Sequence, residues 1–161
     1  MAKRARKYWL MKSEPDVYSI DDLERDGVES WEGVRNYQAR NFMREMTPGD
    51  LALFYHSNAK PPGVAGICRI HRAAYADDTQ FDRKSKYFDP KSKEEDPRWS
   101  MVDVEFVEKL AEPLPLQAVK DDPALEGMVL TQKGSRVSVQ PVEKGHFRRV
   151  LKVGGAKTKI R

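Results

Sequence analysis

The chain has 161 residues, of which 39% are hydrophobic and 34% are charged, and its net charge at pH 7 is +4. This composition is typical of one globular domain, and no apolar run approaches the ~18 residues that cross a bilayer, so a disordered chain and a membrane partner are excluded. The single cysteine, Cys68, excludes an internal disulfide and a thiolate metal cluster, so we expect a cytoplasmic protein, nuclear if the source is eukaryotic.

Positive charge is concentrated at the two ends of the chain. Residues 1–7 and 152–161 each carry four Lys or Arg and no acid, and removing these eight charges leaves −4 for residues 8–151. Basic arms commonly bind phosphates in a salt-dependent way, although lysines that only keep the ends soluble would look the same. We therefore predict a basic arm at 1–7, one domain at 8–152 and a basic tail at 153–161.

The N-terminal half predicts short strands and helices in alternation. A first strand at 8–11 is followed by "YSIDDLERDG", where Ser19 and Asp22 fit a capping box and Gly27 can end the helix. Asn36 can cap a second helix that ends at "TPGD". "DLALFYHS" and "GVAGICRIH" predict two strands, joined by a loop at "NAKPPG".

The C-terminal half begins with a polar excursion at 73–98 that has almost no periodicity. "WSMVDVEFVEKL" then predicts a strand, because Val102, Val104 and Phe106 alternate with mainly polar residues. "PLQAVKDDPALEG" predicts broken helix or turn, "GSRVSVQPV" a strand and "EKGHFRRVLKV" a helix. Strands and short helices without a regular βαβ repeat indicate an α+β fold, which we expect to be a small, mostly antiparallel β-barrel.

Three tryptophans lie in different surroundings. Trp9 has strand neighbours and is expected in the core. Trp31 lies at a loop–helix junction in "SWEGVRNYQARNFM", and Trp99 ends the excursion at "DPRW". Large rings with polar neighbours are what base stacking uses, yet a tryptophan that covers a core edge has the same pattern, so both interpretations stay open for Trp31 and Trp99.

Polar residues end two of the predicted strands. "MKSEP" places Lys12 and Ser13 at the end of the first strand, before Pro15, and "FYHSN" likewise places Tyr55, His56 and Ser57 at the end of a later strand. Such groups can hydrogen-bond to the edge of a base, but a strand that ends at these residues without any binding role would have the same sequence pattern.

Catalytic and metal-binding patterns are not found in the sequence. The three histidines lack metal-ligand spacing, and the chain has neither a "GxxxxGK" nor a "GxSxG" motif. Adjacent residues of a strand point to opposite faces, so His56 and Ser57 cannot form a nucleophile–base pair. Cys68 is expected to be a small buried residue. We expect no catalytic residue, no metal and no cofactor.

Several longer stretches together resemble the EVE domain. They are "YWLMKSEPDVYSIDDL", "WEGVRNYQARNFM", "FYHSN…PPGVAGI", "DPRWSMVDVEFV" and "SRVSVQPV". They occur in the family's order over about residues 7–152 and are similar to the thymocyte nuclear protein family and its bacterial relatives. The resemblance implies a PUA-like barrel with short helices around it, related to YTH and ASCH domains, some of which recognise modified bases.

The resemblance also implies where a base would bind. The matching pocket positions are Lys12, Ser13, Trp31, Asn36, Tyr55, His56, Ser57 and Trp99. The residues expected to contact phosphates are Arg35, Arg40 and Arg136. Trp31 and Trp99 would wall the ring, as the cage tryptophans do in the YTH pattern. The excursion before Trp99 would then be an ordered flap over the barrel mouth.

The predicted function is non-enzymatic binding of DNA or RNA through one unstacked, modified, for example methylated, base. The chain would act as a monomer. Two other functions remain open: a PUA-like hydrolase that acts on modified nucleosides or RNA, and a small-metabolite-binding module.

Overall fold

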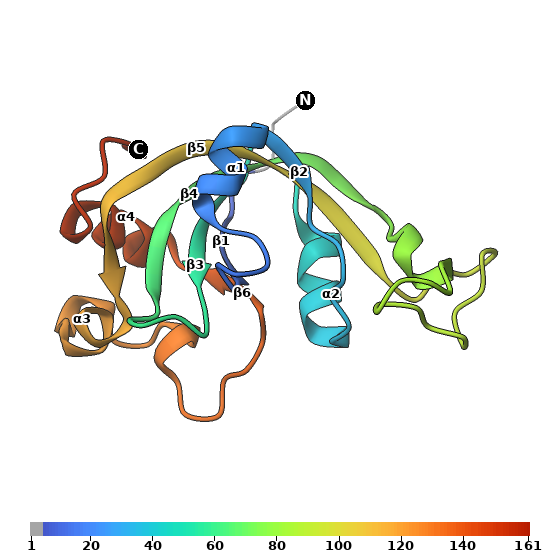
Figure 1. The fold of residues 1–161 in the computed structure, drawn as a ribbon. Helices are drawn as coiled ribbons and strands as arrows, with labels where there is room; N and C mark the ends of the chain where they lie inside the picture. Colours follow the sequence, from blue (N-terminus) through green and yellow to red (C-terminus); the bar gives the residue numbers. More distant parts are fainter. Residues whose placement is uncertain (1–4) are drawn as a thin grey trace.

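One six-stranded sheet organises the computed structural model, which describes residues 5–161 (Figure 1). Lys3 and Arg4 of the predicted basic arm lie outside the described residues. The strands are β1 (Tyr8–Ser13), β2 (Val28–Ser30), β3 (Leu51–His56), β4 (Gly63–Ala76), β5 (Ser100–Pro115) and β6 (Val139–Val142). The α-helices are α1 (Ile20–Asp26), α2 (Tyr37–Glu45), α3 (Leu116–Asp121) and α4 (Lys144–Val153). Three 3₁₀ turns are η1 (Asp78–Phe81), η2 (Pro123–Leu125) and η3 (Val129–Thr131).

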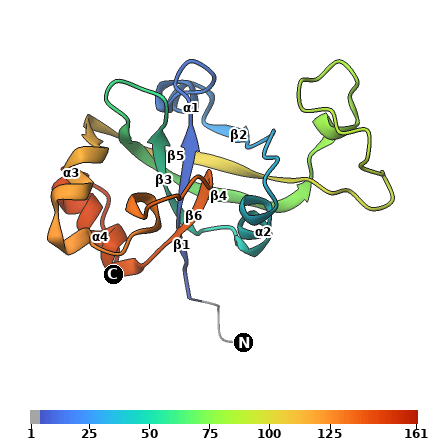
Figure 2. The same ribbon diagram turned by 90° about the horizontal axis from the view of Figure 1, so that it is seen from below.

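The sheet is mostly antiparallel, as the sequence predicts. Its order is β2-β5-β4-β3-β1-β6, and within it β1 runs parallel to β3 while the other neighbouring pairs are antiparallel. β4 and β5 arch across the molecule, so that the sheet curves like a barrel (Figures 1 and 2). Because β2 and β6 are the two edges of this order, the barrel does not close.

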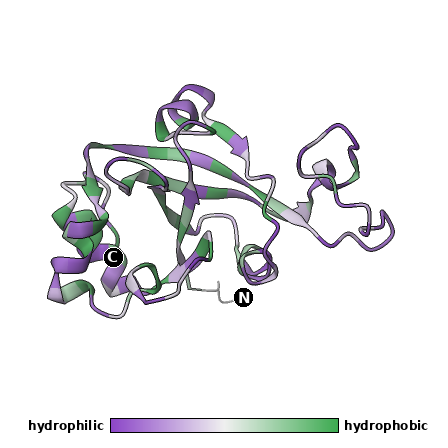
Figure 3. Ribbon diagram, turned by 60° about the horizontal axis from the view of Figure 1, so that its bottom comes forward, coloured by the Kyte–Doolittle hydropathy of each residue, from purple (hydrophilic) through white to green (hydrophobic). Residues whose placement is uncertain are grey.

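Both faces of the central strands are buried, because successive side chains of a strand point to opposite sides. Trp9 and Met11 of β1 pack in a cluster with residues of α1 and α2, whereas Tyr8 and Leu10 pack in a second cluster with residues of α3 and α4. Figure 3 shows hydrophobic residues along the central strands, and mostly hydrophilic ones in the segment that projects between β4 and β5. Helices therefore cover the two faces of one sheet, and the ends of β1 and β3 are free to line a site.

Local capping fixes where the first two helices begin. The Asp22 amide donates to Ser19 Oγ over 3.1 Å and the Ser19 amide donates to the Asp22 carboxylate over 2.8 Å, which is the predicted capping box. The Asn36 side chain accepts from the Ala39 amide over 2.9 Å at the start of α2. Gly27 follows α1 with φ +78°, a conformation that favours glycine. These predicted helix ends are confirmed.

Several predicted strand boundaries differ from the structure. β1 ends at Ser13 and β5 at Pro115, both later than the sequence predicts. The strand expected over "GSRVSVQPV" is reduced to β6, and the Gln140 side chain donates to the Val137 carbonyl just before it over 2.8 Å. β4 extends to Ala76, so the polar excursion is shorter and covers residues 77–98.

The excursion is ordered, and a buried glutamine joins its two ends. The Gln80 side chain donates to the carbonyls of Asp77 and Trp99 over 2.6 and 2.9 Å, and it accepts from the Trp99 amide over 3.0 Å. Gln80 has no exposed surface. These hydrogen bonds therefore hold the two ends of the excursion together, so it is not an unattached, solvated loop.

The C-terminal tail is also tied to the sheet. The Glu108 carboxylate on β5 accepts from the amides of Lys157 and Thr158 over 2.7 and 2.8 Å, and Ile160 packs against the second cluster. Within residues 5–161, no helix has both the length and the apolar character required to cross a membrane.

Candidate functional site

A cavity of about 640 Å³ opens where the C-terminal end of β1, the segment after β2 and the excursion meet. Its lining residues are 12–14, 17–18, 29–35, 57, 86–87, 136 and 138. Six of the residues singled out in the sequence line it: Lys12, Ser13, Trp31, Arg35, Ser57 and Arg136. Segments far apart in the chain therefore form one concave surface.

The end of β1 supplies one wall. Lys12 and Ser13 pair in register with Tyr55 and His56 of β3, and the Lys12 amide donates to the Ser138 carbonyl over 2.8 Å. Ser13 Oγ donates to the Tyr18 carbonyl over 2.6 Å, which fixes the turn before α1. Burial lowers the pKa of the Lys12 ammonium, because the charged form loses hydration. This wall thus presents short polar groups and one half-buried cation.

Trp31 belongs to both the core and the cavity. Its amide donates to the Val102 carbonyl on β5 over 2.7 Å, and its ring meets the Phe54 ring edge-on with centroids 5.5 Å apart. Only 7% of the residue is exposed, yet it lines the cavity. The two interpretations that the sequence left open are therefore not exclusive, since one ring can pack with one face and wall a cavity with the other.

An arginine clamp brings the excursion to the cavity. Arg35 donates to the Tyr87 carbonyl from Nε and Nη2 over 3.0 and 2.7 Å, and to Thr79 Oγ1 over 3.1 Å. Its guanidinium also pairs with the fully buried Asp77 carboxylate at 3.2 Å, and that carboxylate accepts from the Gly33 amide over 2.7 Å. The donors of Arg35 are thus directed at the protein itself, where they hold the wall in place.

Tyr87 is the second aromatic wall of the cavity, and it was not among the residues predicted to line it. Its ring lies against Gly33, where an added Cβ would be 2.5 Å from the Tyr87 ring, and Gly33 has φ +85°. Any other residue at position 33 would meet both backbone strain and the ring. The sequence contained two separate signals: an aromatic residue inside a polar excursion, and a glycine at the junction that follows Trp31. No local pattern relates positions 33 and 87, so the two signals could not be connected.

Several predicted pocket residues do not line this cavity. Tyr55 is 3% exposed and packs in the second cluster, and Asn36 caps α2. His56 Nε2 accepts from the Ile20 amide over 3.1 Å and so joins β3 to α1. Trp99 Nε1 donates to the Asp89 carboxylate over 2.7 Å, and the Trp99 ring stacks on Tyr37. Arg40 lies beside that stack, on α2.

The cavity carries both signs of charge. Its cations are Lys12, Arg35, Lys86 and Arg136, and its carboxylates are Glu14, Glu29 and Glu32. Burial, followed by the nearby Asp77 and Glu29 carboxylates, raises the pKa of Glu32. A cavity with carboxylates among aromatic walls can accept hydrogen bonds from a ligand's amino group, which a purely cationic cavity could not do.

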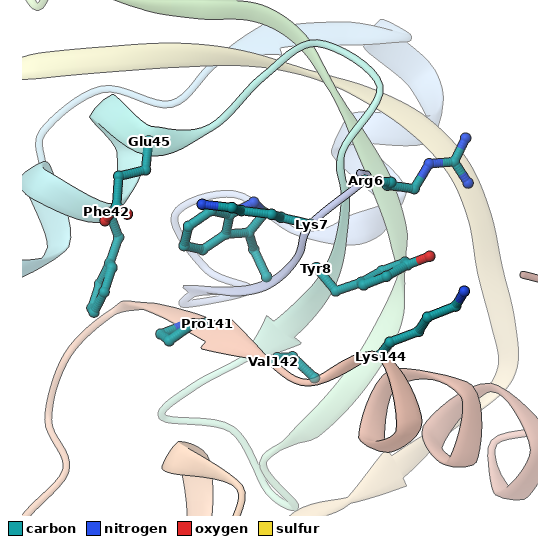
Figure 4. A pocket seen from close by; sticks show the side chains of 9 residues that line it. Arg6, Lys7, Tyr8, Phe42, Glu45, Pro141, Val142 and Lys144 are labelled. Carbon is teal, nitrogen blue, oxygen red and sulfur yellow. The ribbon is translucent and has the colours of Figure 1, made fainter. Parts of the chain in front are cut away.

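A smaller hollow of about 370 Å³ lies at the opposite end of β1 (Figure 4). Phe42 of α2 faces Pro141 of β6 across it, and Arg6 and Lys144 extend at its rim. Its aromatic floor is Tyr8 and Trp9, which are 7% and 2% exposed. Trp9 Nε1 already donates to the Asp50 carboxylate over 3.1 Å, so this donor is not available to a ligand in the hollow.

Cys68 and the potential metal-ligating side chains are the remaining groups with reactive chemistry. Cys68 is completely buried, and burial raises the pKa of its thiol to about 12. Within residues 5–161, no three His, Cys, Asp or Glu side chains are grouped to hold a metal ion.

His56 makes the stability depend on pH. Burial lowers its pKa below the ordinary value of 6.5; the Asp21 carboxylate opposes this effect and the Lys109 ammonium adds to it. Protonation of Nε2 would also break the hydrogen bond from the Ile20 amide. The unfolded chain then binds more protons than the folded one, so we expect the free energy of unfolding to be fully retained above about pH 6.5 and to fall as the pH drops below it.

Urea unfolding from about pH 8 to 5 measures this dependence of stability on pH. His56→Gln should flatten the curve, and a matched change at exposed His71 should not; equal slopes in all three proteins would contradict the assignment.

Comparison with known proteins identifies relatives that span nearly the whole chain. The family model described as "EVE domain" matches residues 7–153. Thymocyte nuclear protein 1 of Homo sapiens is 43% identical over 168 residues, which cover 92% of this chain and 74% of the relative. A crystal structure from Pseudomonas putida has a TM-score of 0.89 and 48% identity, covering 91% of this chain and 99% of that one. The human THYN1 protein in complex with 5-methylcytosine-containing DNA has a TM-score of 0.87 and 42% identity, covering 96% and 99%. The expected resemblance and the PUA-like fold are confirmed.

Proposed function

The chain belongs to the EVE domain family, and from this premise we propose that it binds nucleic acid by taking one unstacked, modified base into the cavity beside Trp31. The observation that carries the proposal is the similarity to a relative crystallised with 5-methylcytosine-containing DNA. The proposal treats the chain as a reader without enzymatic activity. A 5-methylated cytosine is accordingly the first ligand to test.

The dimensions and walls of the cavity suit a nucleobase. Ligand cavities commonly measure roughly 300–1,000 Å³, and this one measures about 640 Å³. Trp31 and Tyr87 offer aromatic surface from two different segments, and stacking contributes ~1–3 kcal/mol per base. A methyl group adds apolar area to bury between such walls, worth ~0.8 kcal/mol.

The polar groups of the cavity suit the edge of a cytosine. Carboxylates accept hydrogen bonds from the cytosine amino group, and Glu29 and Glu32 lie in the lining. Lys12 and Ser57 offer donors for the ring nitrogen and the carbonyl oxygen, whereas the Ser13 hydroxyl already donates to the Tyr18 carbonyl. Among the predicted phosphate-binding residues, Arg136 is exposed in the lining and is the best placed to meet the backbone.

The basic ends of the chain would bind phosphates at a greater distance. Arg6 and Lys144 at the rim of the smaller hollow, with Lys157 and Lys159 of the tail, would then add salt dependence without base selectivity. We propose a monomer as the binding unit. It would act where nucleic acid is present: in the cytoplasm, or in the nucleus of a eukaryote, as the names of the thymocyte nuclear proteins suggest.

Binding measurements on matched oligonucleotides test the proposal. Fluorescence polarisation should compare single strands, DNA and RNA, that differ only in one central cytosine or 5-methylcytosine, together with the DNA duplexes. We expect the methylated single strand to bind about fourfold more tightly than the unmethylated one, which is the equivalent of one buried methyl group. Duplexes should bind more weakly, because flipping the base requires a few kcal/mol.

Two results would contradict this function. Equal affinity for methylated and unmethylated strands would exclude recognition of this modification. Chromatographic detection of a product from a modified nucleoside or from RNA would instead support the hydrolase alternative.

A further inference from the structure

An exposed tyrosine lies on a fixed aromatic stack outside the cavity. Tyr37, in the first turn of α2, is 51% exposed although it is a large aromatic residue. Its ring stacks on the ring of Trp99, with centroids 4.8 Å apart and planes 27° from parallel. Trp99 is 5% exposed and is held by the hydrogen bond from its Nε1 to Asp89. The stack therefore presents one aromatic surface to solvent on a rigid support.

Two arginines on the same helix flank this surface. The guanidinium carbon of Arg40 lies 4.7 Å from the centre of the Tyr37 ring, and Arg40 donates to the Arg98 carbonyl over 2.9 Å. Arg44, one turn further along α2, donates to Ser100 Oγ over 3.0 Å. In the described part of the chain, neither guanidinium forms an ion pair with a carboxylate. Two neighbouring cations without an acid partner favour an anionic ligand.

The stack continues to the wall of the cavity. The guanidinium of Arg35 lies 5.5 Å from the Trp99 ring centre and 5.6 Å from the Tyr87 ring centre. Tyr87 lines the cavity, so the sequence of stacked groups runs from the cavity wall through Arg35 and Trp99 to exposed Tyr37. A strand whose one base is in the cavity would thus have a second aromatic surface a few stacked groups away.

We propose that Tyr37 stacks on an unpaired base near the modified base in the same strand, while Arg40 and Arg44 bind the phosphates beside it. The proposal rests on the proposed function, since it adds a second base contact to the same strand. The partner is single-stranded nucleic acid, because a base within a duplex already has both faces covered. Base stacking on tyrosine is largely independent of sequence, so this site adds affinity without selecting the neighbouring base.

A fluorescent base tests the stacking directly. The probe is a short single-stranded DNA with one 5-methylcytosine and 2-aminopurine placed in turn at each of the two positions on either side. We expect the wild-type protein to quench the fluorescence at one of these positions, because 2-aminopurine loses emission when it stacks. Tyr37→Ala should remove that quenching and weaken binding of the oligonucleotide about tenfold, and Tyr37→Phe should retain both.

The free nucleoside separates stacking from support of the cavity wall. Tyr37→Ala should leave the affinity for 5-methyl-2′-deoxycytidine unchanged, since a nucleoside has no neighbouring base. If the nucleoside and the oligonucleotide lose affinity equally, Tyr37 acts only by supporting Trp99, and the proposal is overturned. Quenching that persists in Tyr37→Ala would overturn it as well.

The arginines have their own readout and control. Arg44→Ala should reduce the slope of log affinity against log salt by ~0.7, as expected for one lost phosphate contact on a single strand. Arg148→Ala removes an equal charge from the exposed face of α4 and should leave the slope unchanged. Equal slopes for wild type and Arg44→Ala would exclude the phosphate contact.

Failure of this inference can be told apart from failure of the proposed function. If the wild-type protein binds the methylated strand but Tyr37→Ala binds it equally well, only the second base contact is wrong. If the wild-type protein binds neither the nucleoside nor the strand, both proposals are wrong.

Discussion

Trp31→Ala is expected to abolish binding of the modified base and to lower the free energy of unfolding by about 3–5 kcal/mol, as for other buried aromatic residues cut back to alanine. The residue is 7% exposed, packs edge-on against Phe54 and also lines the cavity, so both losses follow from one ring. Urea unfolding and binding of a 5-methylcytosine oligonucleotide measure them. A Trp31 that only stacked on the base and did not pack in the core would instead leave the free energy of unfolding almost unchanged on truncation.

A control variant that loses a similar free energy of unfolding separates the loss of binding from the loss of stability. Phe147→Ala removes a fully buried ring from the second cluster, away from the cavity, and should destabilise by a similar amount. Measured at low temperature, where both variants are folded, Phe147→Ala should still bind the oligonucleotide and Trp31→Ala should not. Trp31→Phe should restore most of the stability and part of the affinity. Normal binding by folded Trp31→Ala would refute the role of Trp31 as a cavity wall.

Asp77→Ala is expected to have the second largest effect, because it removes the acceptor at the centre of the clamp. The fully buried carboxylate pairs with Arg35 and accepts from the amides of Gly33 and Thr79. Removing one partner of a buried ion pair leaves the other charge uncompensated, and the typical loss is about 3–5 kcal/mol. Since Arg35 also holds the Tyr87 carbonyl, we expect the excursion to loosen and the cavity to lose its second aromatic wall.

Hydrogen exchange localises the effect of Asp77→Ala. Amides of residues 77–98 should exchange faster than in the wild type, whereas those of β1 and β3 should change less. Asp78→Ala, which removes the neighbouring exposed carboxylate, should change stability by no more than about 0.5 kcal/mol. If Asp77→Ala weakens binding no more than Asp78→Ala does, the clamp does not position the cavity wall.

Much of the fold could be predicted from the sequence, because its signals are local. The Ser19–Asp22 capping box and the Asn36 cap involve residues three positions apart, and their helices begin where predicted. The alternation at Val102 and Val104 predicted the buried face of β5, because it too is a pattern among residues close in the sequence. The two caps are hydrogen-bonding patterns that a single turn completes, and the alternation is a pattern within one strand, so all three can be recognised without knowledge of distant contacts.

The cavity depends on contacts that no local pattern encodes. Lys12 and Ser13 could be placed at a strand end from Pro15, but the second aromatic wall could not be predicted. Tyr87 lies within the excursion and Trp99 follows it twelve positions later, and both are aromatic residues in a largely polar stretch. The hydrogen bonds of Arg35 to the Tyr87 carbonyl place Tyr87 at the cavity, whereas Asp89 and Tyr37 hold Trp99 behind it.

The class of fold, the helix caps, the main strands and the two polar residues that end β1 follow from local patterns in the chain. That Trp31 is both core and wall, and that Tyr87 rather than Trp99 lines the cavity, follows only from the folded arrangement. Caps and alternation act over a few residues, whereas the clamp joins Gly33 and Arg35 to Asp77 and Tyr87 across more than 40 positions. Which ring faces the cavity is set by those long-range hydrogen bonds.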